Sequence, residues 1–275
     1  MTTLQFLSAL VLVAAGLSLA MAGAWLVWRR TGNSGWVDTI WSFAVGGVGI
    51  AGALAPFALY GEPSFRQGLV IVLVAAWALR LGLHIASRSA GVADDPRYAQ
   101  LAREWGTDAP RQMFWLVQKQ ALVSIPLALS IVLAAWNPVG LRLQDALGAA
   151  VLVIGIAGEA IADAQLRRFR RNTEGSSRVC DTGLWRWSRH PNYFFEWFGW
   201  LAYPLLAIDL GGAYPWGWLA LAGPACMYWL LVHISGIPPL EAHMLARRGD
   251  AFRAYQTRTS AFFPLPPRPK SGAVA

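Results

Sequence analysis

The chain has 275 residues, of which 56% are hydrophobic and 14% are charged, and its mean hydropathy is +0.40. Because about a quarter of the residues of a soluble domain are charged, this composition argues against a water-soluble protein and predicts an integral membrane protein. The formal net charge is +8, and in so apolar a chain we attribute the arginine excess to membrane topology rather than to nucleic-acid binding.

Seven apolar runs predict membrane spans, each of which needs about 20 mostly apolar residues. The first run lacks the charged start and the cleavage site of a signal peptide, so we expect it to remain as a span. The sixth run is short and contains Pro204, which neighbouring helices can accommodate inside a bundle. The expected spans are residues 4–28, 36–60, 69–85, 113–136, 146–166, 194–208 and 215–234.

Arginine and lysine alternate between the segments that follow these runs. The segments after runs one, three, five and seven hold nineteen of these residues, whereas those after runs two, four and six hold only Arg66 and Arg142. By the positive-inside rule the richer segments face the cytoplasm. We therefore expect an all-α integral membrane bundle of seven transmembrane helices, with the N-terminus outside and the C-terminus in the cytoplasm.

We expect one membrane domain over residues 1–265 and a disordered tail over residues 266–275, which are rich in proline and small residues. Residues 241–264 predict one amphipathic helix near the membrane surface. The two cysteines imply no disulfide framework, and the four histidines lack metal-ligand spacing, so no metal site is expected. The glycine fingerprints of soluble nucleotide-binding folds are absent from the sequence.

Ionisable residues inside the expected spans are costly and therefore indicate function. Asp38 lies just inside the second span, and Glu159 and Asp163 lie four residues apart on one face of the fifth. Two interpretations remain for this face. Asp163 either pairs with Arg167 alone, or it belongs to a polar stripe that faces a ligand cavity.

The stretch "GLWRWSRHPNYFFEWFGW" predicts a ligand site at the start of the sixth span. The proline after His190 favours a helix start there, and Asn192 and Glu196 then share a face of the helix. Free backbone amides and the helix dipole, with Arg186 and Arg189 beside them, favour an anion such as phosphate. Contact with lipid phosphates would explain the arginines alone, and a hydrogen-bonded helix cap would explain His190 alone. Their combination with Asn192 and Glu196 favours a bound ligand.

This stretch and the later "SGIPPLEAHMLARRGDAFRAYQTRTSAFFPLP" resemble the C-terminal region of the steroid 5-alpha-reductase family. They resemble more closely the largely uncharacterised bacterial membrane proteins that are grouped with that family. The resemblance covers roughly residues 35–265, and "WALRLGLHIASRSAG" is part of it. The "RHPNY" motif is also similar to motifs of sterol reductases and isoprenylcysteine carboxyl methyltransferases.

The resemblance implies a seven-helix membrane fold that binds NADPH from the cytoplasmic side. An arginine guanidinium can donate two parallel hydrogen bonds to a phosphate, while carboxylates and asparagine accept hydrogen bonds from ribose hydroxyls and the carboxamide. The cofactor-binding residues that we expect are Asp163, Arg170, Arg178, His190, Asn192, Tyr193, Glu196, Glu241 and Tyr255.

One departure from the family concerns the substrate. The steroid enzymes hold the 3-oxo group of the substrate with an early Gln-Glu pair and a later tyrosine, whereas this chain has Asp38 and Ile85 in the matching stretches. We therefore expect Asp38, protonated through burial, or His84 to polarise or protonate the substrate. The expected reaction is NADPH-dependent hydride transfer to an activated C=C bond of a lipophilic substrate, such as a steroid-like or fatty enone.

Two alternatives stay open. An S-adenosylmethionine-dependent methyltransferase of the isoprenylcysteine type has a similar motif, but its cofactor carries no phosphate to match the arginines. A non-catalytic lipid-binding membrane protein is the other. The basic residues are nearly all arginine, which is typical of a GC-rich bacterial genome, so we expect a protein of the bacterial inner membrane. We also expect a monomer. Its expected partners are membrane lipids and a lipophilic small molecule, and not nucleic acid.

Overall fold

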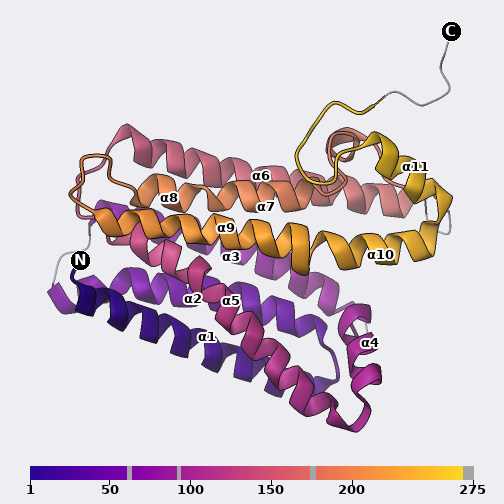
Figure 1. Cartoon of the computed structure of the whole chain (residues 1–275), viewed down its shortest axis with the longest axis horizontal. Coiled ribbons are helices and arrows are strands. Elements are labelled where there is room, and N and C mark those ends of the chain that lie inside the picture. The colour runs from indigo at the N-terminus through magenta and orange to yellow at the C-terminus, as the bar shows by residue number, and fades with distance from the viewer. Residues whose placement is uncertain (61–63, 92–93, 174–177, 269–275) are drawn as a thin grey trace. The chain divides into compact units, whose positions relative to one another are not determined.

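The computed structural model describes residues 1–60, 64–91, 94–173 and 178–268 (Figure 1). These residues are mostly helical and contain no strand, which confirms the all-α class. The elements in chain order are α1 (Thr3–Thr31), α2 (Gly35–Tyr60), α3 (Phe65–Ser89), α4 (Pro96–Trp105), η1 (Gly106–Asp108), α5 (Ala109–Ala135), α6 (Leu143–Asn172), η2 (Gly183–Arg186), α7 (Pro191–Trp200), α8 (Ala202–Ala207), η3 (Pro215–Leu221), α9 (Ala222–Trp229), the π-helical turn η4 (Leu230–Ile234), α10 (Ile237–Arg248) and α11 (Asp250–Arg258).

Six helical stretches in the described residues are long and apolar enough to cross a membrane, which supports the prediction of an integral membrane protein. They correspond to all the expected spans except the sixth. The stretches are Thr3–Thr31, Gly35–Ala55, Phe65–Ser89, Tyr98–Ala135, Leu143–Asn172 and Pro215–Arg248.

The sixth expected span is divided into α7, with 10 residues, and α8, with 6 residues. Pro204 has no N–H to bond the carbonyl of Trp200, so a continuous helix would lack one backbone hydrogen bond there. The chain instead closes α7 with a tight turn in which the Leu201 N–H donates to the Phe198 carbonyl at 3.1 Å. Neither helix alone reaches membrane length, so a seventh crossing stays a prediction.

The chain forms two compact units. Unit 1 comprises Met1–Ala149 and Tyr203–Gly223, and unit 2 comprises Ala150–Ala202 and Pro224–Ala275. In unit 1, α2 packs against α1, α3 and α5. Small residues make this approach close, since a Cβ atom on Gly52 would lie only 2.5 Å from a methyl carbon of Val132.

In unit 2, α6 and α7 pack backbone to backbone. A Cβ atom added to Gly155 would lie 2.7 Å from the Cα atom of Gly199, and one added to Gly158 would lie 2.3 Å from the ring of Phe195. Glycine at both positions is therefore required for this packing distance.

The expectation of one amphipathic helix over residues 241–264 is wrong, because the chain breaks at Gly249. Its φ of +51° is a conformation that side chains rarely adopt. The break separates α10 from α11, which form the last helices of the chain (Figure 1). Of the tail expected at 266–275, Arg268 donates its N–H to the Arg258 carbonyl at 2.9 Å, and residues 269–275 lie outside the described residues.

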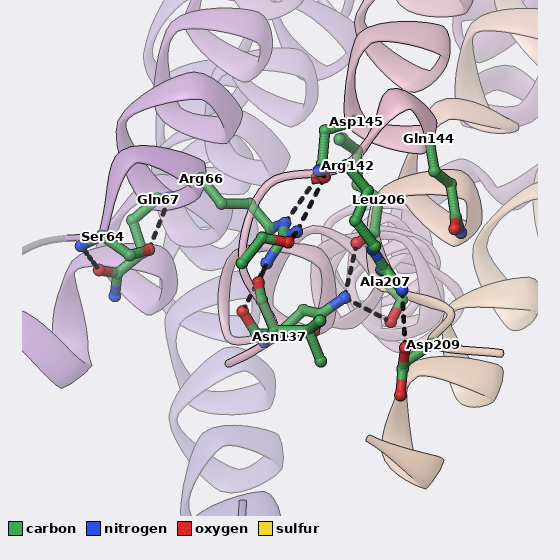
Figure 2. A network of polar contacts seen from close by, with 12 residues as sticks. Ser64, Arg66, Gln67, Asn137, Arg142, Gln144, Asp145, Leu206, Ala207 and Asp209 are labelled. Atoms are coloured by element: carbon green, nitrogen blue, oxygen red, sulfur yellow. Dashed lines mark hydrogen bonds and ion pairs between the residues drawn. The ribbon is translucent and has the colours of Figure 1, made fainter. Parts of the chain in front are cut away.

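A buried arginine joins three segments of unit 1 (Figure 2). Arg66, only 2% exposed, places Nε 2.6 Å from Oδ1 of Asp145 and Nη2 2.8 Å from Oδ2. The same guanidinium donates to the carbonyls of Asn137, Val139 and Gly140. The start of α3, the loop after α5 and the first turn of α6 are thereby fixed to one another.

The other arginine of the expected outer loops is also paired (Figure 2). Nη1 of Arg142 lies 2.6 Å from Oδ1 of Asp209. Asn137 closes the same region by donating through Nδ2 to the carbonyls of Leu206 and Ala207, at 3.0 and 3.1 Å. Both arginines that stand outside the basic segments are thus bound to aspartates within unit 1.

Candidate functional site

The predicted helix start at His190 is present in unit 2. His190 is the N-cap of α7, proline occupies the first turn, and the first backbone bond runs from the Phe194 N–H to the His190 carbonyl at 3.0 Å. Within the described residues, no side chain caps this end of the helix. The first-turn amides therefore keep the partial positive charge of a helix N-terminus.

The imidazole of His190 is buried, with 3% exposure of the residue. Nε2 lies 2.9 Å from Oε1 of Glu241, and the ring stacks on Tyr193 with 5.5 Å between centroids. Nδ1 has no hydrogen-bond partner in the part of the chain that the structure describes. Burial lowers the pKa of His190 below its ordinary value of 6.5, although the hydrogen bond and charge of Glu241 act in the opposite direction.

Glu241 is the centre of the polar contacts behind His190. Its Oε1 lies 2.7 Å from Nε of Arg189, and its Oε2 accepts from Nη2 of Arg189 at 3.2 Å and from Nε2 of Gln256 at 2.7 Å. Arg189 also donates through Nη1 to the carbonyls of Gln256 and Thr259. Arg189, expected beside a bound phosphate, is thus occupied largely by the protein itself.

Tyr255 fixes the segment that precedes α7. Its buried hydroxyl donates to the Trp185 carbonyl, and burial raises the pKa of Tyr255 above its ordinary value. Ser188 extends the connection, because its hydroxyl donates to the Phe262 carbonyl at 2.8 Å and accepts from the His190 N–H at 3.1 Å. Tyr255 and Glu241 therefore both position the α7 start, and direct contact of either with a cofactor stays a prediction.

The structure brings together the polar faces that were predicted on α6 and α7. Nδ2 of Asn192 donates to Oδ1 of Asp163 at 3.3 Å, while Oδ1 of Asn192 is buried without a partner among the described residues. One turn further along α7, Glu196 accepts from Nε1 of Trp200 at 2.8 Å. Asp163 and Glu196 are both buried, so the site contains two carboxylates and an unpartnered amide oxygen.

The two arginines expected to bind the cofactor lie on the surface of unit 2. Arg170 is exposed in the last turn of α6, and Arg178 is exposed just after residues 174–177, which the structure does not describe. Their exposure leaves both side chains accessible to a ligand from solution.

The expected substrate residues belong to unit 1. Asp38, in the first turn of α2, accepts from the Tyr98 hydroxyl at 2.8 Å, and this hydroxyl accepts from Nε2 of Gln120 at 2.8 Å. Oε1 of Gln120 is buried without a partner in the described residues. His84 is partly buried on α3. Sequence reasoning missed Tyr98 and Gln120, although a glutamine inside an apolar helix was a usable signal.

Fold and site define the class as a helical membrane protein with membrane-length helices and buried polar groups. The chain belongs to the family described as "Protein of unknown function (DUF1295)", a steroid 5-alpha-reductase-like family whose model matches residues 24–259. An uncharacterized protein of Schizosaccharomyces pombe is 34% identical over 87 residues, which are 30% of this chain and 23% of that relative. The chain thus matches less than a quarter of the relative's length. No solved structure matches the chain.

Proposed function

We propose that this protein is a membrane-embedded reductase that uses NADPH to reduce an activated C=C bond in a lipophilic substrate, such as a steroid-like or fatty enone. Membership of a steroid 5-alpha-reductase-like family over residues 24–259 supports this class of reaction. The observation that carries the proposal is the pair of buried, unpartnered atoms Nδ1 of His190 and Oδ1 of Asn192, as counted in the described residues. Each such atom costs about 1–3 kcal/mol when it is left without a partner, so a ligand that donates hydrogen bonds would be favoured.

The side chains of unit 2 fit the chemical groups of NADPH. Asp163 and Glu196 can accept hydrogen bonds from ribose hydroxyls, and Asn192 from a hydroxyl or an amide. Exposed Arg170 and Arg178 can bind the phosphates, which a guanidinium contacts through two parallel hydrogen bonds. When bound, NADPH supplies the hydride for the reaction.

The hydrogen-bonded residues of unit 1 suit the substrate carbonyl. Hydride addition to the β-carbon of an enone places negative charge on the carbonyl oxygen, and a hydrogen-bond donor stabilises that charge. The Tyr98 hydroxyl, which donates to Oδ1 of Asp38 at 2.8 Å, is the hydrogen-bonding group that we assign, together with Asp38, to the substrate oxygen. Gln120 keeps this hydroxyl oriented, since its Nε2 donates to it. His84 stays an alternative proton donor in this proposal.

Cofactor binding by the purified protein in detergent tests the proposal. NADPH, NADH and S-adenosylmethionine are titrated in parallel by calorimetry, and we expect NADPH to bind most tightly. Arg170→Ala and Glu196→Ala should each weaken NADPH binding by about tenfold, the equivalent of one charged hydrogen bond. Arg111→Ala, an exposed arginine of α5 in unit 1, serves as the control and should bind NADPH as the wild type does.

The other results would each select a different function. Binding of S-adenosylmethionine without NADPH would identify a methyltransferase. Failure of all three compounds to bind would leave a non-catalytic lipid-binding protein. If NADPH binds, its oxidation in the presence of lipophilic enones then identifies the substrate class, and Tyr98→Phe should reduce kcat more than it changes the affinity for NADPH.

A further inference from the structure

A cavity of about 470 Å³ lies within unit 1. Its wall is formed by the starts of α1 and α3 and by residues 135–141, which end α5 and follow it. Pockets that bind small molecules measure about 300–1,000 Å³, so the cavity is large enough for a ligand. The chemistry of its wall indicates which class of ligand it can hold.

The buried polar side chains of the wall are bound to the protein itself (Figure 2). All five N–H groups of the Arg66 guanidinium donate, either to the Asp145 carboxylate or to backbone carbonyls. Asn137 uses both of its amide N–H groups on carbonyls of α8, and its Oδ1 accepts from a backbone N–H at 3.1 Å. Arg66 and Asn137 therefore offer no N–H group to a ligand.

The two helix starts in the wall are closed by their own side chains. A helix N-terminus attracts anions because its first-turn amides lack partners. Thr2 and Gln5 form a capping box at the start of α1, and Ser64 and Gln67 form one at the start of α3. The charge of the arginine in the wall is likewise balanced by an aspartate at 2.6 Å. Neither the helix starts nor the arginine gives the cavity the free positive charge that would favour a phosphate or a carboxylate.

The other side chains of the wall are apolar. Phe65 and Leu141 are 74% and 51% exposed. Trp136 is half-buried, and its indole N–H donates to the Gly52 carbonyl at 2.9 Å, so the ring offers the cavity an apolar surface. Covering such side chains with hydrocarbon is favourable, because it removes apolar area from water.

We propose that this cavity binds the hydrocarbon chain of a single-chain amphiphile or of a membrane lipid, without recognition of the polar head group. The bond from Trp136 to Gly52 places the cavity beside the second half of α2, about 20 Å along the helix from Asp38. Its wall shares no residue with the expected substrate or cofactor site. The inference therefore goes beyond the proposed function and does not rest on it.

Quenching of tryptophan fluorescence by bromine tests the inference, because Trp136 lies in the wall. The protein is purified in a fluorinated surfactant, whose chains mix poorly with hydrocarbon, and is titrated with bromoalkanols of increasing chain length. We expect saturable quenching of the signal that is lost in Trp136→Phe, with an affinity that rises about fourfold per methylene group until the cavity is filled. The bromoalkanoate of the same length should bind with about the same affinity.

A larger side chain at Gly140 should compete with the ligand for the cavity. A Cβ atom on Gly140 meets no atom within 4 Å, and the carbonyl that accepts from Arg66 is kept in any substitution. Gly140→Leu should therefore fold and should weaken alkanol binding by about tenfold. Gly68→Leu is the matched control, because Gly68 of α3 has the same open space at its Cβ position but does not line the cavity.

A second pair of variants tests the apolar rim. Phe65→Ser should weaken alkanol binding by about tenfold. Leu143→Ser is its control, since Leu143 is 77% exposed but lies outside the wall, and this variant should bind as the wild type does.

Brominated phospholipids in nanodiscs identify the source of the chain. Weaker quenching in Gly140→Leu than in the wild type would assign the cavity to a membrane lipid, whereas equal quenching beside saturable alkanol binding would assign it to a free amphiphile. The inference is overturned by alkanol quenching that does not saturate or by equal alkanol affinities of Gly140→Leu and the wild type. A strong preference for the alkanoate would also overturn it, because the cavity would then be an anion site.

Discussion

Arg66 is buried in unit 1 with its guanidinium surrounded by one carboxylate and three carbonyl groups. A buried charge is tolerated in a protein interior only when such partners replace water. Removing the arginine leaves Asp145 as an uncompensated buried charge. We expect Arg66→Met to lower the free energy of unfolding by about 3–5 kcal/mol, as measured by denaturant titration in detergent micelles.

Two further variants separate the charge effect from the loss of packing. Arg66→Met combined with Asp145→Leu removes both charges and should recover part of the lost stability. Arg142→Met should cost less than Arg66→Met, since the Arg142 side chain is 27% exposed and a partly exposed pair contributes less. Equal losses in the two single variants would contradict the argument.

His190 predicts a pH dependence of stability. Its pKa is lowered in the folded protein below the ordinary value of 6.5, so the unfolded chain takes up the proton first as the pH falls. The neutral imidazole therefore contributes fully to the free energy of unfolding above a pH of about 6.5. Below this pH the free energy of unfolding falls, by at most about 1.4 kcal/mol per pH unit.

The measurement compares the wild type with His190→Gln, which has no titrating group at this position. As the pH is lowered from about 8 to about 5, the wild type should lose stability relative to the variant. The free energy of unfolding of the wild type minus that of His190→Gln should therefore decrease. A difference that does not change with pH would show that His190 does not titrate below its ordinary pKa.

At the scale of helices, the packing of α6 on α7 depends on glycine. A methyl group on Gly155 would lie 2.7 Å from the Cα atom of Gly199, and a backbone atom cannot move aside as a flexible side chain can. We expect Gly155→Ala to lower the free energy of unfolding by about 1–3 kcal/mol through separation of the two helices.

Gly47→Ala provides the control for this substitution. No atom lies within 4 Å of the Cβ position of Gly47 in α2, so this change should be neutral or should stabilise the protein by up to about 1 kcal/mol through higher helix propensity. Thermal unfolding of both variants in the same detergent decides between the effects. A Gly155→Ala protein as stable as Gly47→Ala would remove the close-packing argument.

Helices could be predicted from the sequence where a single physical signal dominated. Long apolar runs gave α1, α2, α3, α5 and α6, because membrane length and composition alone determine them. Pro204 predicted a kink in the sixth run, but not a division into two helices at Leu201. The break at Gly249 was missed, because it depends on the left-handed backbone conformation of one glycine.

The candidate site was predictable only in part. The helix start at His190 followed from proline, and helical spacing placed Asn192 and Glu196 on one face of that helix. The contact between Asn192 and Asp163 did not follow from spacing, because it joins two helices. The pairing of His190 with Glu241, 51 residues later, depends on how α10 folds back within unit 2. The pairing of Asp38 with Tyr98 likewise depends on packing between distant segments, which spacing along one helix cannot reveal.

For the whole molecule, the number of crossings decides on which sides of the membrane the loops lie. The basic segments predict seven crossings, but the chain from 191 to 207 forms two short helices rather than one long helix. Its 17 residues would extend about 25 Å as a helix, slightly less than the roughly 30 Å of a bilayer core. Such a short segment can cross where the bilayer thins locally.

Reporter fusions in a bacterial host test the seventh crossing. We expect alkaline phosphatase to be active when fused after Gly212 and inactive when fused after Asn172, because seven crossings place these two positions on opposite sides. Fusions after Gly140, expected outside, and after Asp108, expected inside, calibrate the assay. Activity that is equally low after Asn172 and Gly212 would mean that α7 and α8 do not cross. The two termini would then lie on the same side, and either the positive-inside assignment of the basic C-terminal helices or the outside position of the N-terminus would have to be abandoned.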